Sequence, residues 1–461
     1  MARDYDLVCI GSGPAGQRAA VQAAKLGKRA AIVECRQVVG GACLQTGTIP
    51  SKTFREAVVQ AGFGPADGAA RPRPPRPTAE RLLERVRHVL TREAEVMERQ
   101  LRRNEVAVHW GEARFVDPHT LELTGPEGSA RITADFVLIA VGTRPTAPKG
   151  VAVDDETVMT SDGVVALRRL PKTLAVVGAG VIGIEYASMF AAIGVEVTLV
   201  DQRNRPLEFL DGEIVDELIH QMRNANVVFR GGESVERIEV SDGPVRKVAI
   251  HLESGKRIVS EMVLFSVGRT GDTERLDLPA AGLAADERGR LKVDEQFRTS
   301  VPHILAAGDV IGYPSLAATS SRQGRLAALH AFGAGTVELT ALFPIGIYSI
   351  PEISMIGSTE QELTAGRVPY EVGIARYREI ARGQILGDDS GLFKMLFHRQ
   401  TRRLLGVHII GTGATELLHI GQAVMTLDGG LDYFLHAVFN YPTLAECYKV
   451  AALDASNKLR F

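Results

Sequence analysis

The clearest pattern in the chain is a short apolar run that leads into a glycine-rich turn and then into an alanine-rich, helical stretch. Residues 6–10 have the composition of a buried strand, residues 11–16 form the turn, and a second apolar strand follows the helix at 29–33. This order predicts a βαβ unit of a parallel sheet. The same order returns at residues 173–200. We therefore predict an α/β fold that contains two Rossmann-like units.

Each unit ends in an acidic residue, Glu34 in the first and Asp201 in the second, the same number of residues beyond the last glycine of its turn. The glycines let the backbone approach a pyrophosphate at the helix N-terminus, and the acid can accept hydrogen bonds from a ribose. The turn residues are Gly11, Ser12, Gly13, Pro14, Ala15 and Gly16 in the first copy, and Gly178, Gly180 and Gly183 in the second. The repeat predicts two bound dinucleotides, most economically a resident flavin dinucleotide and an exchanging nicotinamide dinucleotide. The alternative is a pair of tight turns that bind no ligand.

The composition is that of an ordinary globular protein of about three domains, because 461 residues exceed a single core. With 45% apolar residues, 23% charged residues and a net charge of −2, we expect no nucleic-acid or membrane partner. The N-terminus lacks the apolar region of a signal peptide, so we expect the cytoplasm. The Pro- and Arg-rich residues 71–77 indicate a surface linker, and the charged helix expected near 78–104 has a solvated face rather than a basic binding patch.

The chain has four cysteines, Cys9, Cys35, Cys43 and Cys447. They are too few and too scattered for a disulfide framework, and no pair has zinc-ligand spacing, so we predict no metal site. We expect Cys9, Cys35 and Cys447 to pack as small apolar residues.

Residues 40–52 carry the most informative chemistry. They resemble the active-site helix of the flavin disulfide reductases, such as dihydrolipoamide dehydrogenase, in which two cysteines form a redox-active disulfide. Here Cys43 occupies the first position and Thr48 the second, and a hydroxyl cannot form a disulfide. In those relatives a histidine near the C-terminus manages the proton of the thiol. Tyr441 stands in its place, and a phenol with a pKa of about 10 is a poor base at neutral pH.

These two matched replacements indicate a reaction without thiols. The chain resembles the soluble pyridine nucleotide transhydrogenases in segments that span nearly its whole length, namely residues 47–52, 268–271, 309–316, 346–353 and 439–446. The resemblance implies an FAD-binding domain formed by 1–150 and 272–342, an inserted NAD(P)-binding domain at 151–271, and an α+β dimerisation domain at 343–461. It also implies a homo-oligomer that is at least a dimer.

The resemblance further implies roles for single residues. Lys52 lies beside flavin N5 and pairs with Glu185, where a cation stabilises developing negative charge; the alternative is a purely structural ion pair between domains. Asp309 hydrogen-bonds the ribityl chain, although it could instead cap the following helix. Further cofactor contacts are implied for Gly41, Ala42, Cys43, Thr48, Gly142 and Gly268.

Nucleotide selection is expected in the loop after the second acid. Asp201 suits the 2′-hydroxyl of NAD, while Arg203 and Arg205 could bind the 2′-phosphate of NADP. The alternative is a pair of solvent-exposed loop arginines. For Cys43 two interpretations stay open, a spectator thiol and a thiol that cycles through sulfenic acid.

The implied reaction is hydride transfer from NADPH to NAD⁺ through N5 of a tightly but non-covalently bound FAD, which gives NADP⁺ and NADH without a redox-active disulfide. NADPH and NAD⁺ use the same site in turn. The alternatives are a diaphorase-type or single-cysteine flavin reductase, and a flavin-binding subunit without enzymatic activity.

Overall fold

The computed structural model describes residues 3–63, 75–126, 128–148, 150–241, 246–335 and 342–459. Residues 71–74, within the stretch expected to be a linker, lie outside the described residues. Each described helix is too short or too polar to cross a membrane.

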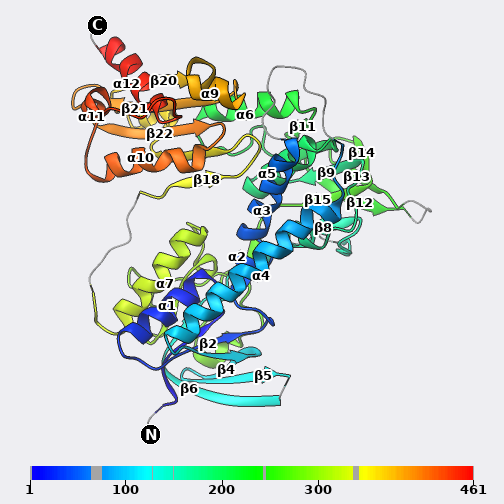
Figure 1. The fold of residues 1–461 in the computed structure, drawn as a ribbon. Coiled ribbons are helices and arrows are strands. Elements are labelled where there is room, and N and C mark those ends of the chain that lie inside the picture. Colours follow the sequence, from blue (N-terminus) through cyan, green and yellow to red (C-terminus); the bar gives the residue numbers. More distant parts are fainter. Residues whose placement is uncertain are drawn as a thin grey trace.

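The first βαβ unit forms the centre of a seven-stranded sheet, drawn at the bottom of Figure 1. The strand order is β3-β2-β1-β6-β5-β4, and β17 also pairs with β6. Strand β1 runs parallel to β2 and β6, and its residues 7–10 are buried, as expected of a strand covered on both faces. The elements are β1 (Tyr5–Ile10), α1 (Pro14–Lys25), β2 (Ala30–Glu34), α2 (Gly41–Gln45), α3 (Thr48–Val58), α4 (Ala79–Arg103), β3 (Ala107–Trp110), β4 (Glu112–Asp117), β5 (Thr120–Gly125), β6 (Gly128–Ile139), β17 (Ile304–Ala306) and α7 (Ala317–Ala331).

The second βαβ unit forms a parallel five-stranded sheet in the order β11-β10-β9-β15-β8. A three-stranded antiparallel sheet, β12-β13-β14, packs beside it, and the two-stranded ribbon β7-β16 pairs the segments that enter and leave the unit. The elements are β7 (Thr143–Pro145), β8 (Val158–Thr160), β9 (Thr173–Val177), α5 (Val181–Ala192), β10 (Glu196–Asp201), α6 (Gly212–Asn224), β11 (Val228–Gly231), β12 (Val235–Val240), β13 (Val248–Leu252), β14 (Arg257–Ser260), β15 (Met262–Phe265) and β16 (Arg269–Gly271).

The C-terminal part is an antiparallel sheet in the order β18-β19-β22-β21-β20, covered by helices (Figure 1). Its elements are β18 (Ile345–Ile347), β19 (Ile353–Gly357), α8 (Glu360–Ala365), β20 (Tyr370–Arg376), α9 (Ala381–Leu386), β21 (Leu392–His398), β22 (Leu404–Ile410), α10 (Ala414–Thr426), α11 (Leu431–His436) and α12 (Glu446–Leu459). The predicted fold class, two Rossmann-like units and a C-terminal α+β domain, is confirmed. The exact domain limits given above stay a prediction.

Two smaller expectations have different outcomes. The helix expected near 78–104 is present as α4, capped by the Thr78 side chain, and most of its charged side chains are exposed. Cys9 and Cys447 are buried as expected, but the expectation for Cys35 is wrong. Cys35 is exposed because it stands just beyond the end of β2, where the chain leaves the sheet.

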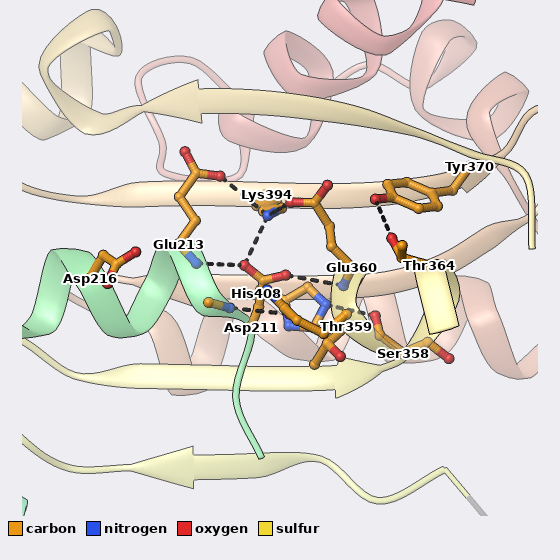
Figure 2. A network of polar contacts seen from close by, with 12 residues as sticks. Asp211, Glu213, Asp216, Ser358, Thr359, Glu360, Thr364, Tyr370, Lys394 and His408 are labelled. Carbon is orange, nitrogen blue, oxygen red and sulfur yellow. Dashed lines mark hydrogen bonds and ion pairs between the residues drawn. The ribbon is translucent and has the colours of Figure 1, made fainter. Parts of the chain in front are cut away.

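A buried lysine joins the second unit to the C-terminal sheet. Lys394 on β21 is fully buried, and its Nζ lies 2.8 Å from Asp211 Oδ1 and 3.2 Å from Glu213 Oε2 at the start of α6. Glu360 at the start of α8 also hydrogen-bonds this ammonium group, and the four side chains point toward one another in Figure 2. Burial alone would raise the pKa of Asp211, but the hydrogen bond and charge of Lys394 lower it below its ordinary value. The pair therefore stays ionised and fastens α6 to the C-terminal sheet.

Candidate functional site

A cavity of about 660 Å³ lies where the first unit, the second unit and the C-terminal sheet meet. It collects predicted site residues that are far apart in the sequence, namely Gly11, Ser12, Gly13, Pro14, Ala15, Glu34, Gly41, Ala42, Cys43, Thr48, Lys52, Gly142, Glu185 and Asp309. Other predicted residues do not line it: Gly16, Gly178, Gly180, Gly183, Asp201, Arg203, Arg205 and Gly268. Among residues 151–271, the cavity is lined by Ser161, by Arg269 on β16, and by four residues of α5, namely Val181, Ile182, Glu185 and Tyr186.

The two glycine-rich turns have the same local construction. Gly11 and Gly178 adopt φ values of +103° and +102°, which an L side chain rarely adopts. A Cβ added at Gly13 or at Gly180, the second glycine of each turn, would meet no atom within 4 Å. This open space in front of a helix N-terminus fits the pyrophosphate of a dinucleotide in both units.

The acids at the ends of β2 and β10 are buried and face their own turns. Glu34 Oε2 accepts a hydrogen bond from the Ser12 backbone N–H at 3.1 Å and another from the Ser12 hydroxyl. Asp201 Oδ2 accepts one from the Ala179 backbone N–H at 2.6 Å. The guanidinium of Arg203 also donates to Asp201, since its Nε and Nη2 lie 2.9 and 2.8 Å from the two carboxylate oxygens. Burial alone would raise the pKa of Asp201, but these hydrogen bonds together hold it below its ordinary value.

Arg205, the second arginine of the predicted phosphate site, is engaged elsewhere in the same loop. It lies 2.7 Å from Asp216 on α6 and donates to the carbonyl of Gly212. Both Asp216 and Arg205 are partly exposed, so this ion pair is worth at most about 1 kcal/mol. Arg203 and Arg205 therefore belong to the same loop but have different partners. Arg203 pairs with Asp201, and Arg205 pairs with Asp216.

Asp309 lies on the cavity wall at the start of a short 3-10 helix. Its oxygens make long hydrogen bonds, 3.5 Å to Thr143 and 3.4 Å to Ser320. Burial raises its pKa above the ordinary value. The carboxylate does not cap α7, which begins after Leu316 without a side-chain cap. It thus keeps hydrogen-bonding capacity for a polar group in the cavity.

Lys52 on α3 and Glu185 on α5 form an ion pair between the two units. Lys52 Nζ lies 2.8 and 2.7 Å from the two oxygens of Glu185. The Glu185 side chain is 3% exposed, whereas Lys52 is 26% exposed and faces the cavity. The acid is therefore the buried anchor of the pair, and the ammonium group is the accessible end.

Cys43 and Thr48 lie on two consecutive short helices, α2 and α3, rather than on one continuous helix. Both side chains line the cavity. Burial raises the pKa of the Cys43 thiol more than the neighbouring Thr48 hydroxyl lowers it. All four cysteines are free, and Thr48 supplies a hydroxyl where a disulfide partner would stand.

The sequence did not predict the contributions of three residues, of which Arg269 and Tyr348 line the cavity and Arg55 does not. Arg269 holds Thr143, the partner of Asp309, with Nε 2.8 Å from the Thr143 hydroxyl. Arg55 on α3 is buried and contacts the C-terminal part at Glu352, 3.4 Å away. The burial of Arg55 could not be predicted from the sequence, because an arginine in an amphipathic helix such as α3 is usually exposed. Tyr348, which directly follows β18, lines the cavity.

Tyr441, which replaces the expected histidine, is 74% exposed in the segment before α12. It does not line the cavity of its own chain. The family resemblance implies that the C-terminal segment, which contains Tyr441, reaches the flavin site of the partner subunit, and this stays a prediction.

Known proteins resemble this chain over its whole length. Residues 5–324 match the sequence profile of the pyridine nucleotide-disulphide oxidoreductases, and residues 343–452 match that of their dimerisation domain. The chain is 53% identical to a soluble pyridine nucleotide transhydrogenase of Mycobacterium bovis, with 99% of this chain and 98% of that protein covered. It is 43% identical to the protein of that name from Vibrio vulnificus, with 99% of each covered.

Solved structures agree with the fold. The Cu(II) complex of the HOCl-induced flavoprotein disulfide reductase RclA of Escherichia coli superposes with a TM-score of 0.88 at 27% identity, covering 98% of this chain and 99% of that one. LpdA of Mycobacterium tuberculosis gives a TM-score of 0.88 at 25% identity, covering 97% and 99%. The family resemblance seen in the sequence is thus confirmed, as is a C-terminal dimerisation domain typical of a homo-oligomer. The chain belongs to the pyridine nucleotide-disulphide oxidoreductase family and, within it, to the group of soluble pyridine nucleotide transhydrogenases.

Proposed function

We propose that this protein catalyses hydride transfer from NADPH to NAD⁺ through a tightly bound, non-covalent FAD, without a redox-active disulfide. The observation that carries the proposal is the pair Cys43 and Thr48 on the cavity wall, where the hydroxyl occupies the place of a second thiol. Electrons that reach this cavity cannot pass to a disulfide. They leave through a second nicotinamide nucleotide or are lost to oxygen.

The residues of the first unit fit a resident flavin dinucleotide. When bound, FAD supplies a ring whose N5 accepts and donates a hydride. The open space at Gly13 takes the pyrophosphate, Glu34 accepts hydrogen bonds from the ribose, and Asp309 binds the ribityl hydroxyls. Lys52 presents a cation to the cavity and stabilises the negative charge that develops during hydride transfer.

The second unit fits the exchanging nucleotide. Asp201 can accept hydrogen bonds from the 2′-hydroxyl of NAD, and Arg203 can turn from Asp201 toward the 2′-phosphate of NADP. Because Arg203 is 39% exposed, this movement does not require the core to open. One loop can therefore serve both nucleotides in turn, with Arg205 as a second phosphate ligand.

The direct test is an assay of NADPH with thio-NAD⁺, run beside NADPH with lipoamide and with glutathione disulfide. We expect fast formation of thio-NADH and no turnover of either disulfide. Rapid disulfide reduction would overturn the proposal, and flavin that NADPH does not bleach would indicate a subunit without this activity.

A single-cysteine reductase, the alternative function, is not favoured. Burial raises the pKa of Cys43, so little nucleophilic thiolate is present at neutral pH. Peroxide turnover that disappears in Cys43→Ala would restore that alternative. We also propose that the enzyme acts in the cytoplasm as a homo-oligomer built on at least a dimer.

A further inference from the structure

The ion pair between Lys52 and Glu185 is covered by a segment that belongs to neither dinucleotide unit. This segment, residues 345–352, runs from β18 toward β19 of the C-terminal sheet. Tyr348 stands directly after β18. Its backbone N–H donates to Glu185 Oε1 at 2.9 Å, and its ring centroid lies 5.0 Å from Lys52 Nζ.

The backbone contact completes the hydrogen bonding of a buried carboxylate. Glu185 is 3% exposed, and an ionised carboxylate in such a place must be paired and hydrogen-bonded. Lys52 donates to both of its oxygens, and the Tyr348 N–H adds a donor to Oε1. Together these donors fix the plane of the Glu185 carboxylate.

The ring of Tyr348 acts on the other partner. An ammonium group within about 6 Å of an aromatic centroid is attracted to the face of the ring. The ring is half-buried and lies beside Gly346, where an added Cβ would be 3.5 Å from Tyr348 Cε2. Lys52 is thereby confined between a carboxylate and an aromatic face, with its exposed side toward the cavity.

The covering segment is fastened to both helices that carry the pair. The N–H of Ile350 donates to the hydroxyl of Ser188 on α5 at 3.0 Å. Arg55 on α3 donates through Nε to the carbonyl of Ser349 at 3.0 Å. The position of Tyr348 is therefore tied to α3 and α5 together.

We propose that Tyr348 is a positioning residue for hydride transfer, which holds the Lys52–Glu185 pair in one arrangement with the ammonium group at the flavin cavity. This inference rests on the proposed role of Lys52. Tyr348 acts through the pair and does not itself exchange a proton or a hydride.

The test is a double-mutant cycle on the holoenzyme, with anaerobic flavin reduction by NADPH followed by stopped-flow absorbance. Tyr348→Leu should slow the limiting reduction rate about fivefold. The KM for NADPH should stay close to that of the wild type. Tyr348→Phe keeps the ring and should return the rate to within about twofold of the wild type. In a Lys52→Met background, Tyr348→Leu should have no further effect.

Other outcomes would contradict the role of Tyr348 alone, or the roles of Lys52 and Tyr348 together. A slow Lys52→Met variant combined with an unaffected Tyr348→Leu variant would overturn this inference alone. Equal slowing by Tyr348→Leu in both backgrounds would do the same, since it would show an effect independent of Lys52. An unchanged rate in Lys52→Met would overturn the role of Lys52 and the inference with it. If Tyr348→Leu does not retain flavin, Tyr348→Met replaces it in the cycle.

Discussion

The two βαβ units share the same local construction at their glycine turns, and they differ in which groups hydrogen-bond their acids. At equivalent positions Glu34 and Asp201 each accept a backbone N–H from the residue two places on, Arg36 at 2.9 Å and Arg203 at 2.8 Å. The guanidinium of Arg36 then turns away to Gln45, whereas that of Arg203 returns to Asp201.

A hydroxyl accounts for the difference. In the first unit the Ser12 hydroxyl bonds Glu34 and also accepts the N–H of Gly40, 2.8 Å away, which ties the turn to the start of α2. The second unit has Ala179 at the position of Ser12, so Arg203 fills the remaining capacity of Asp201. Glu34 is therefore held by the short Ser12 hydroxyl, and Asp201 by the long, partly exposed side chain of Arg203. This contrast fits a resident cofactor in the first unit and exchanging nucleotides in the second.

The largest effect is expected where the second unit meets the C-terminal sheet. Lys394→Met leaves Asp211 buried without its cation, which should lower the free energy of unfolding by about 3–5 kcal/mol. Denaturant unfolding followed by circular dichroism measures it. Lys458→Met, which removes a partly exposed ion pair with Asp454, is the matched control and should cost at most about 1 kcal/mol. Equal losses of unfolding free energy in the two variants would contradict a stabilising role for the buried pair of Lys394 and Asp211.

The same glycine substitution in each unit should separate the two sites. A Cβ at Gly16 would lie 1.9 Å from the Gly11 carbonyl oxygen, and one at Gly183 would lie 1.8 Å from that of Gly178. Overpacking of this kind costs about 1–3 kcal/mol, so each substitution should weaken binding at its own site about tenfold or more. Gly16→Ala should lose FAD on purification, while Gly183→Ala should keep FAD and show a raised KM for NADPH. Loss of FAD from Gly183→Ala would break the assignment of the units.

The smallest effect is expected at the arginines two residues beyond the acids. Arg203→Ala should raise the KM for NADPH about tenfold, because a charge-assisted phosphate contact is lost, and should change the KM for NADH much less. Arg36→Ala is the matched control in the first unit and should leave the ratio of the two KM values unchanged. The double variant with Arg205→Ala should deepen the effect on NADPH. Equal effects on both nucleotides would refute phosphate binding by this loop.

The sequence was sufficient for features that are local along the chain. The glycine turns and their acids were predictable because a βαβ unit places all its parts within a short stretch. The pairing of Lys52 with Glu185 came from the family resemblance and is present as an ion pair, while its role in the reaction stays a prediction.

Other features depend on tertiary packing and could not be predicted. The partner of the Arg203 guanidinium is a matter of side-chain geometry, and the Tyr348 contact uses a backbone N–H, which any residue type supplies. The burial of Lys394 is an exception that the sequence does indicate. This lysine stands inside the apolar strand β21, and a buried lysine requires buried carboxylates as partners.

The most direct test of the central claim is an anaerobic titration of the holoenzyme with dithionite, followed by flavin absorbance and by counting free thiols. If the flavin has no disulfide partner because Thr48 stands beside Cys43, one two-electron equivalent per FAD should complete the reduction and no new thiol should appear. Uptake of a second two-electron equivalent per FAD, with the appearance of new thiols, would contradict the account.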